Sequence, residues 1–199
     1  MTGQRPPESV SADALRPPAG DADRIELVAG EASFATAPQA GRPLMVLAAD
    51  GRAMASGARF DMRRAGPAVR VTCIDGSVQV ERRAEAMAIG PGQQVSYDAR
   101  GLGRIVPADL ELVTAWQQGV LIFRLTPLAE VVAEINRYRP GRVILLDAAL
   151  GGKAVSGRFR IDHVDEILLR LGQAFGIRNR SLPGGIVLLI LRVQRRGSV

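Results

Sequence analysis

The sequence has almost none of the residues that form disulfides and transition-metal centres. Its 199 residues include one cysteine, Cys73, and one histidine, His163. A lone cysteine cannot close an internal disulfide, and a site that needs several cysteine and histidine ligands, such as a zinc finger, is excluded. Only carboxylate metal sites are left. Because the sequence also lacks a phosphate-cradling loop, we expect a protein without metal or cofactor.

Long apolar runs are also missing. The longest uninterrupted aliphatic run is Ile186–Leu191, far shorter than the roughly 20 residues of a membrane-spanning helix. Residues 1–20 have no apolar core of the kind that a signal peptide needs. The sequence as given therefore predicts a soluble chain without an export signal.

Aromatic residues are scarce, which argues against nucleic-acid binding. The formal net charge is +6, but residues 1–166 are neutral, with 20 basic and 20 acidic residues. The whole excess lies in residues 167–199, which contain six arginines and no acid. Nucleic-acid binders interleave basic and aromatic residues, and aromatics make up only 4% of this chain. We therefore expect no nucleic-acid partner.

The composition that is present, 47% hydrophobic and 23% charged, is typical of a folded protein. Residues 1–20 contain two Pro-Pro pairs and predict an extended or disordered leader. Short apolar runs broken by glycine predict an all-β domain, a sandwich or a roll, over residues 21–107. A linker at 108–112, a mixed domain at 113–193 and a basic tail at 194–199 complete the expected organisation.

Turn dipeptides mark three places in the all-β part. Asp75-Gly76 is the pair preferred in a type I′ hairpin turn, and the flanking alternation predicts that Cys73 faces Val78. Cys73 is then a core strand residue rather than a reactive thiol. A second hairpin is expected around Asp50-Gly51, and Pro91-Gly92 is expected to turn into the strand Gln93 to Tyr97.

Two helices are expected in the mixed domain, because apolar residues recur there at i, i+3, i+4 and i+7. The stripes are Leu128, Val131, Val132 and Ile135 in the first helix, and Val164, Ile167, Leu168 and Leu171 in the second. Thr126 is the expected N-cap of the first helix, with Pro127 at its first position, and Asp162 is the expected N-cap of the second. Gly176 should end the second helix.

Candidate strands surround these helices at residues 120–125, 142–146, 154–159, 177–181 and 186–193. The predicted order is β-α-β-β-α-β-β, with both helices on one face of a small sheet and Pro183-Gly184-Gly185 as the last turn. The predicted fold class is α+β.

No catalytic motif is found, and we do not expect an enzyme. His163 is interpreted as a solvated or cap-associated side chain. Glu130 and Glu134 share one helix face, but they flank the apolar stripe, and Glu134 is placed to form a surface ion pair with Arg137.

The mixed domain resembles the C-terminal region of FecR-type sigma-factor regulators. The resemblance is carried by Ala115-Trp116-Gln117-Gln118-Gly119 with Phe123, by the string PLAEVVAEINRYRPGR at 127–142, and by Val155-Ser156-Gly157 with Phe159. Upstream, the β-rich FecR domain is resembled by Gly30-Glu31-Ala32 with Phe34, Arg42-Pro43, Asp75-Gly76, and the string PGQQV at 91–95.

The resemblance implies a secretin and TonB N-terminal (STN) fold for residues 113–193 and a role in signalling. Family members bind the periplasmic signalling domain of a TonB-dependent outer-membrane receptor and pass an iron-uptake signal to an extracytoplasmic-function sigma factor. We therefore expect a periplasmic region of a single-pass inner-membrane protein, either an excised fragment or a natural truncated paralogue. A structural, secretin-like module of the cell envelope is the alternative. No small-molecule substrate is expected.

Three residues at the end of the first predicted helix, Arg137, Tyr138 and Arg139, are the candidate partner-binding residues. The helices should use their apolar stripes against their own sheet, which leaves strand edges and this polar helix end for a partner. Tyr138 suits a helix-end contact or a partner surface equally well. Trp116 and Phe159 are interpreted chiefly as core aromatics.

Overall fold

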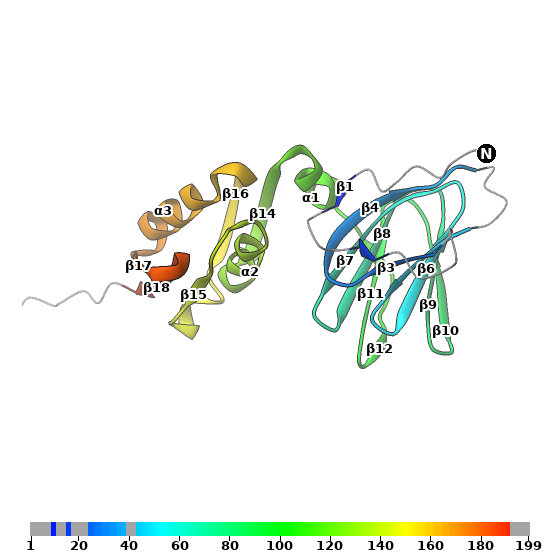
Figure 1. Ribbon diagram of the computed structural model, residues 1–199, viewed down its shortest axis with the longest axis horizontal. Helices are drawn as coiled ribbons and strands as arrows, with labels where there is room; N and C mark the ends of the chain where they lie inside the picture. Colours follow the sequence, from blue (N-terminus) through cyan, green and yellow to red (C-terminus); the bar gives the residue numbers. More distant parts are fainter. Residues whose placement is uncertain (1–8, 11–14, 17–23, 39–42, 192–199) are drawn as a thin grey trace, which may run out of the picture. The chain divides into compact units, whose positions relative to one another are not determined.

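The computed structural model describes residues 9–10, 15–16, 24–38 and 43–191 (Figure 1). Contacts within the chain divide it into two compact units, Met1–Thr114 and Ala115–Val199, named unit 1 and unit 2. The predicted basic tail, 194–199, lies outside the described residues. Strand and helix are both present, and the α+β class is the observed one.

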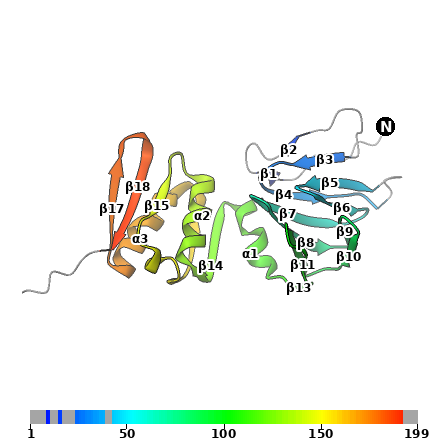
Figure 2. The ribbon, with the colours of Figure 1, turned by 90° about the horizontal axis from the view of Figure 1, so that it is seen from below.

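The described residues of unit 1 form strands followed by one short helix. In chain order these are β1 (Ser9–Val10), β2 (Leu15–Arg16), β3 (Arg24–Leu27), β4 (Gly30–Ala35), β5 (Leu44–Ala48), β6 (Gly51–Ala55), β7 (Arg59–Ala65), β8 (Ala68–Asp75), β9 (Val78–Arg82), β10 (Glu85–Ile89), β11 (Gln93–Asp98), β12 (Gly101–Leu102), β13 (Val106–Pro107) and α1 (Leu110–Thr114). One sheet has the order β1-β4-β7-β8-β11-β12 with β13 added to β11, and the other has the order β10-β9-β6-β5-β3-β2 (Figure 2).

Both sheets of unit 1 contribute side chains to one hydrophobic core. Phe34 and Phe60 stack there with ring centroids 5.1 Å apart, and Val46 and Val80 reach the same core from the other sheet. Cys73 is fully buried in this core, as the sequence predicts.

Two short segments of the predicted leader form strands. Ser9 and Val10 pair with β4, and Leu15 and Arg16 pair with β3, so these short segments add strands to open sheet edges. The rest of the predicted leader lies outside the described residues. Helix α1 begins inside the segment expected to be a linker, where the Asp109 carboxylate accepts a hydrogen bond from the Leu112 N–H.

The hairpin predicted at Asp75-Gly76 is also wrong. Strand β8 pairs with β7 and β11, while β9 pairs with β6 and β10, so the chain passes from one sheet to the other at this turn. Cys73 faces Phe60 and Gln93, not Val78. Gly76 is needed there for another reason: its φ is +78°, and a Cβ would lie 2.8 Å from the Cα of Ala58.

The second predicted hairpin is present, with its turn one residue earlier. Ala48 pairs with Gly51, so the two-residue loop is Ala49-Asp50, and Ala49 takes the positive φ of 50°. The turn at Pro91-Gly92 leads into β11 as expected.

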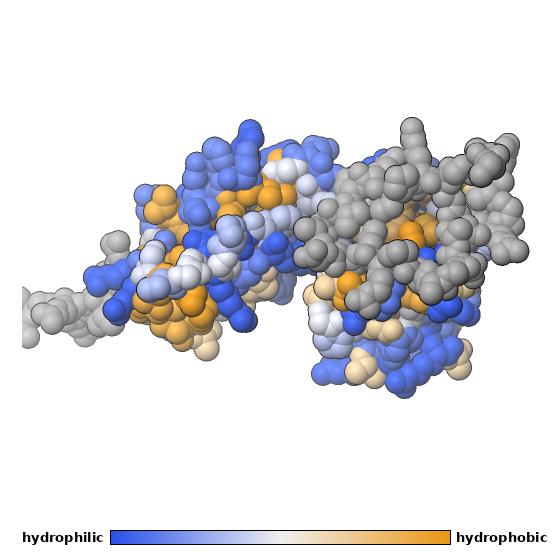
Figure 3. Space-filling model, in the orientation of Figure 1, coloured by the Kyte–Doolittle hydropathy of each residue, from blue (hydrophilic) through white to orange (hydrophobic). Residues whose placement is uncertain are grey.

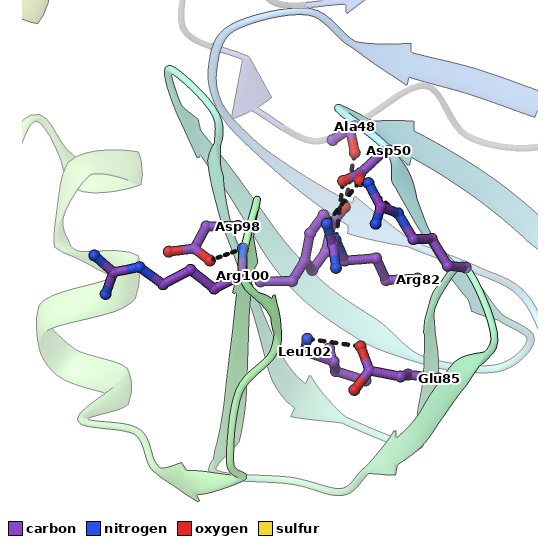
Figure 4. A network of polar contacts seen from close by, with 9 residues as sticks. Ala48, Asp50, Arg82, Glu85, Asp98, Arg100 and Leu102 are labelled. Carbon is purple, nitrogen blue, oxygen red and sulfur yellow. Dashed lines mark hydrogen bonds and ion pairs between the residues drawn. The ribbon is translucent and has the colours of Figure 1, made fainter.

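A polar arrangement fixes the edge of the unit 1 core (Figure 4). The guanidinium of Arg82, 3% exposed, donates two hydrogen bonds to the Asp50 carboxylate at 2.8 and 3.0 Å. This contact holds the pKa of Asp50 below its usual value. The buried Tyr97 hydroxyl donates to the Ala48 carbonyl at 2.9 Å, next to the same turn.

Unit 1 is expected to lose stability in alkaline solution because of two buried acids. Burial raises the pKa of the Tyr97 phenol and that of the Cys73 thiol. Above about pH 8.5 for a thiol and about pH 10 for a phenol, the unfolded chain releases protons that the folded chain retains, so the free energy of unfolding falls as the pH rises. Urea unfolding between pH 7 and 11 measures this loss. The double variant Tyr97→Phe, Cys73→Ala should flatten the alkaline limb, and an unchanged slope would assign the loss to other groups.

Unit 2 has the predicted order of elements, with short 3-10 turns between them. The elements are η1 (Ala115–Gln118), β14 (Val120–Pro127), α2 (Leu128–Tyr138), β15 (Val143–Leu145), η2 (Ala148–Leu150), β16 (Ala154–Arg160), η3 (Ile161–His163), α3 (Val164–Phe175), β17 (Ile177–Leu182), η4 (Pro183–Gly185) and β18 (Ile186–Leu191). The apolar stripes of both helices are buried, as the spacing predicts.

The expectation of one sheet with both helices on one face is wrong. The strands of unit 2 form two sheets, an antiparallel pair β14-β16 and a three-stranded sheet β15-β18-β17. Helices α2 and α3 each contact strands of both sheets, and Figure 2 shows them between β14 and the β17-β18 pair. A sheet of two strands cannot cover two helices alone, so the helices are packed from both sides, and each sheet has an outer face.

Both predicted N-caps are wrong, while the C-cap is confirmed. Helix α2 has Pro127 at its N-cap, and the Thr126 hydroxyl accepts a hydrogen bond from the Arg124 N–H instead. Helix α3 is preceded by η3, in which Asp162 binds Arg160. Gly176 closes α3 in the left-handed conformation, with φ 63°.

Candidate functional site

The candidate partner-binding residues lie where α2 ends. Tyr138 is the last residue of α2, and the N–H of Arg139 closes the helix on the Ile135 carbonyl at 3.1 Å. Pro140 cannot continue the helix, and the chain turns into β15. The Asn136 side chain fixes this turn, because it donates to the carbonyl of Val143 and accepts from its N–H.

Arg139 is held by contacts inside unit 2. Its Nε donates to the Asp165 carboxylate at 2.6 Å, and its Nη1 donates to the Gly185 carbonyl. The side chain is only 12% exposed. Arg139 thus ties the end of α2 to the start of α3 and to η4, and the expectation that it is free for a partner is wrong.

Arg137 is also held by contacts inside unit 2. Its Nη1 donates to Glu134 at 2.7 Å, and its guanidinium carbon lies 5.3 Å from the centroid of the Tyr138 ring. The predicted ion pair is present, but it is not a surface pair, since the Arg137 and Glu134 side chains are 18% and 10% exposed. Arg137 therefore contacts both Glu134 and the ring of Tyr138.

Tyr138 borders an open space in unit 2. It packs on the unit 2 core from one side. On another side it lines a hollow of about 480 Å³, whose wall consists of Gln118, Gly119, Val120, Tyr138, Arg160, Ile161 and Asp162. The hollow therefore combines an aromatic wall with a charged border.

The charged border of this hollow is an ion pair. Arg160 donates to Asp162 from Nε at 2.9 Å and from Nη2 at 2.6 Å. These hydrogen bonds hold the pKa of Asp162 below its usual value. The pair is exposed, which leaves it accessible to groups that enter the hollow.

The remaining residues singled out in the sequence have structural surroundings. His163 is half exposed and lies 3.0 Å from Glu166, at the start of α3. Phe159 packs on the unit 2 core 5.9 Å from Phe123, with Arg158 and Arg160 exposed on the other face, as alternation predicts. Trp116 is half buried in η1.

Within the part of the chain that the structure describes, no three His, Cys, Asp or Glu side chains gather where they could hold a metal ion. No described helix has the length and apolar character needed to cross a membrane.

Sequence reasoning missed the hollow beside Tyr138, because its wall joins segments 118–120 and 160–162, which only the pairing of β14 with β16 brings together.

Comparison with known proteins finds a family match for part of unit 1. Residues 11–79 match the family model described as FecR protein. No curated protein matches the chain.

Two solved structures share the fold over most of the chain. Both are crystal structures of a candidate anti-sigma factor from Parabacteroides distasonis ATCC 8503. The first is 23% identical, covers 90% of this chain and 86% of its own, and superimposes with a TM-score of 0.75. The second is also 23% identical, covers 85% and 80%, and has a TM-score of 0.71.

At this identity the likeness to the solved structures establishes a common fold. The family match adds sequence evidence for the segment from before β2 to the start of β9. It relates this segment, residues 11–79, to the FecR family.

Proposed function

We propose that this chain is the signal-receiving region of a sigma regulator, an anti-sigma factor. The observation that carries the proposal is the combination of a FecR match in unit 1 with a fold shared, over 90% of the chain, with a candidate anti-sigma factor. Each of the two findings comes from a different kind of comparison, and both lead to the same regulatory class. A regulatory protein of this class acts by binding and not by catalysis.

In this proposal unit 2 is an STN-like domain that binds the periplasmic signalling domain of a TonB-dependent outer-membrane receptor. The order β-α-β-β-α-β-β of unit 2 supports the assignment. Among the described residues, β14 and β16 pair only with each other, so both have an open edge to which a partner strand can add.

The proposal places the chain in the periplasm and makes an extracytoplasmic-function sigma factor the second partner. An iron-siderophore signal would reach unit 2 through the receptor and would change the activity of the sigma factor. Tyr138 is the residue of the candidate set that we retain as a contact, because it lines the hollow between segments 118–120 and 160–162.

Calorimetric titration of the chain with the purified signalling domain of the receptor encoded beside it tests this function. The wild-type chain is expected to bind, and Tyr138→Ala to bind with an affinity lower by more than about 1 kcal/mol. A thermal melt of the variant separates lost contact from lost fold, since Tyr138 also packs on the core. If Tyr138→Ala melts early and binds normally once folded, the residue is structural.

Deletion of the gene should also change expression of the promoters that the neighbouring sigma factor controls. If the chain does not bind the receptor domain but assembles into rings in sedimentation experiments, the secretin-like alternative replaces the regulatory one.

A further inference from the structure

The three-stranded sheet of unit 2 has an apolar outer face. Strand β18 is central, and its alternate residues Val187 and Leu189 point inward to the core, together with Val143 of β15 and Ile177 of β17. The residues between them must point outward, because successive side chains of a strand lie on opposite faces.

Register assigns the outward residues to three rows across the sheet. Ile144, Leu188 and Arg180 form the middle row. The row at one end contains Arg142, Ile186 and Leu182, and the row at the other end contains Leu146, Ile190 and Arg178. Hydrogen bonds from Val187 N–H to the Arg142 carbonyl and from Leu146 N–H to the Leu189 carbonyl extend the pairing to both end rows. We call these nine residues the outer face.

Six of the nine residues are aliphatic, and none is fully buried. Leu146 is 56% exposed, and the other five are partly exposed. Figure 3 shows hydrophobic residues gathered on the lower left of the molecule, where Figure 1 draws β15 and β18. Contiguous apolar surface of this kind usually marks an interaction site.

Charge on the outer face has a single sign. Arg142, Arg178 and Arg180 are exposed at its border, and none of them forms a side-chain hydrogen bond or an ion pair with a described residue. Residues 167–199 contain no acid in the sequence. A partner that fits must bring apolar side chains to the centre and carboxylates to the border.

We propose that the outer face is a docking surface for a folded protein domain whose apolar patch is bordered by aspartate and glutamate. The inference rests on the proposed function, and the occupant is the receptor's signalling domain. This surface is additional to the hollow at Tyr138.

Two other occupants fit the charges less well. A second copy of the chain, bound through the same face, would bring two sets of guanidinium groups together, which is unfavourable. A membrane surface is favoured by tryptophan and tyrosine at the water interface, and the outer face contains neither.

The test compares two substitutions on the outer face with two matched substitutions elsewhere. Leu188→Asp puts a carboxylate at the centre of the face, and Arg180→Glu reverses a charge at its border. The controls are Leu169→Asp, at an exposed leucine of α3, and Arg104→Glu, at an exposed arginine of unit 1. Thermal melts check that each variant is folded. If Leu188→Asp does not fold, Arg180→Glu still tests the outer face.

The probe is the purified receptor signalling domain, titrated at low and high salt. Each outer-face variant is expected to raise Kd about tenfold or more, and each control to change it by less than about twofold. The loss from Arg180→Glu should shrink at high salt, because the attraction that it removes is screened there.

The outcomes separate the two proposals. If the wild-type chain binds and both outer-face variants bind equally well, the outer face is overturned and the proposed function stands. If the wild-type chain does not bind the receptor domain, the proposed receptor recognition and this occupant both fail. Self-association that Leu188→Asp abolishes, or binding to phosphatidylglycerol vesicles that it abolishes, would give the face to a second copy or to a membrane and would overturn the inference.

Discussion

Replacement of Leu128 by alanine is expected to lower the free energy of unfolding of unit 2 by about 2–5 kcal/mol. Leu128 is fully buried at the first turn of α2, in the core shared by both sheets and both helices. Removal of its side chain leaves a cavity, because strands on both sides of the helices prevent the site from closing. Urea unfolding of the full chain measures the loss as an earlier transition for unit 2.

Leu169→Ala is the matched control for this experiment. Leu169 is 64% exposed on α3, so the same chemical change should alter stability by less than about 0.5 kcal/mol. Equal losses at the two positions would contradict the burial of the α2 stripe. Neither residue belongs to the outer face. Once folded, both variants should therefore bind the receptor domain with the affinity of the wild-type chain.

The helices of unit 2 could be predicted from the sequence, because a helix records its surroundings locally. The spacing of Leu128, Val131, Val132 and Ile135 states which side of the helix is buried. It does not state what buries it. The same stripe fits against one sheet or between two, and only the pairing of distant strands decides between these arrangements.

The turn at Asp75-Gly76 shows the same limit in unit 1. A turn dipeptide predicts that the chain reverses direction, but it carries no information about the sheet that the next strand will join. Here β8 pairs with β7 and β11. The backbone of residues 57–58 leaves no room for a side chain at Gly76, and this contact joins segments that are far apart in sequence.

The candidate site was located by sequence but not resolved by it. Helix periodicity and Pro140 place Arg137, Tyr138 and Arg139 at the end of α2. Which of them faces a partner depends on Asp165 and on η4, which occupy Arg139, and on Glu134, which occupies Arg137. None of these distances follows from spacing on one helix, except the Glu134–Arg137 pair, which the sequence predicted without its burial.

The contact of Arg139 with η4 depends on the glycine two residues later. Gly141 has φ +92°, a conformation that side chains rarely adopt. A Cβ at this position would lie 2.8 Å from the carbonyl carbon of Gly185 and 3.0 Å from Nη1 of Arg139. The string Arg139-Pro140-Gly141 therefore acts as one unit: the proline ends α2, the arginine holds η4, and the glycine lets η4 approach the chain.

Gly141→Ala is accordingly expected to lower the free energy of unfolding of unit 2 by about 3 kcal/mol or more, since backbone strain and overpacking each cost roughly 1–3 kcal/mol. Gly184→Ala is the control: Gly184 also has a positive φ, +77°, but nothing lies within 4 Å of its Cβ position, so only the strain is added. Urea unfolding of both variants measures the difference. If Gly141→Ala costs no more than Gly184→Ala, then η4 does not pack against Gly141, and Arg139 does not need this turn to reach the Gly185 carbonyl.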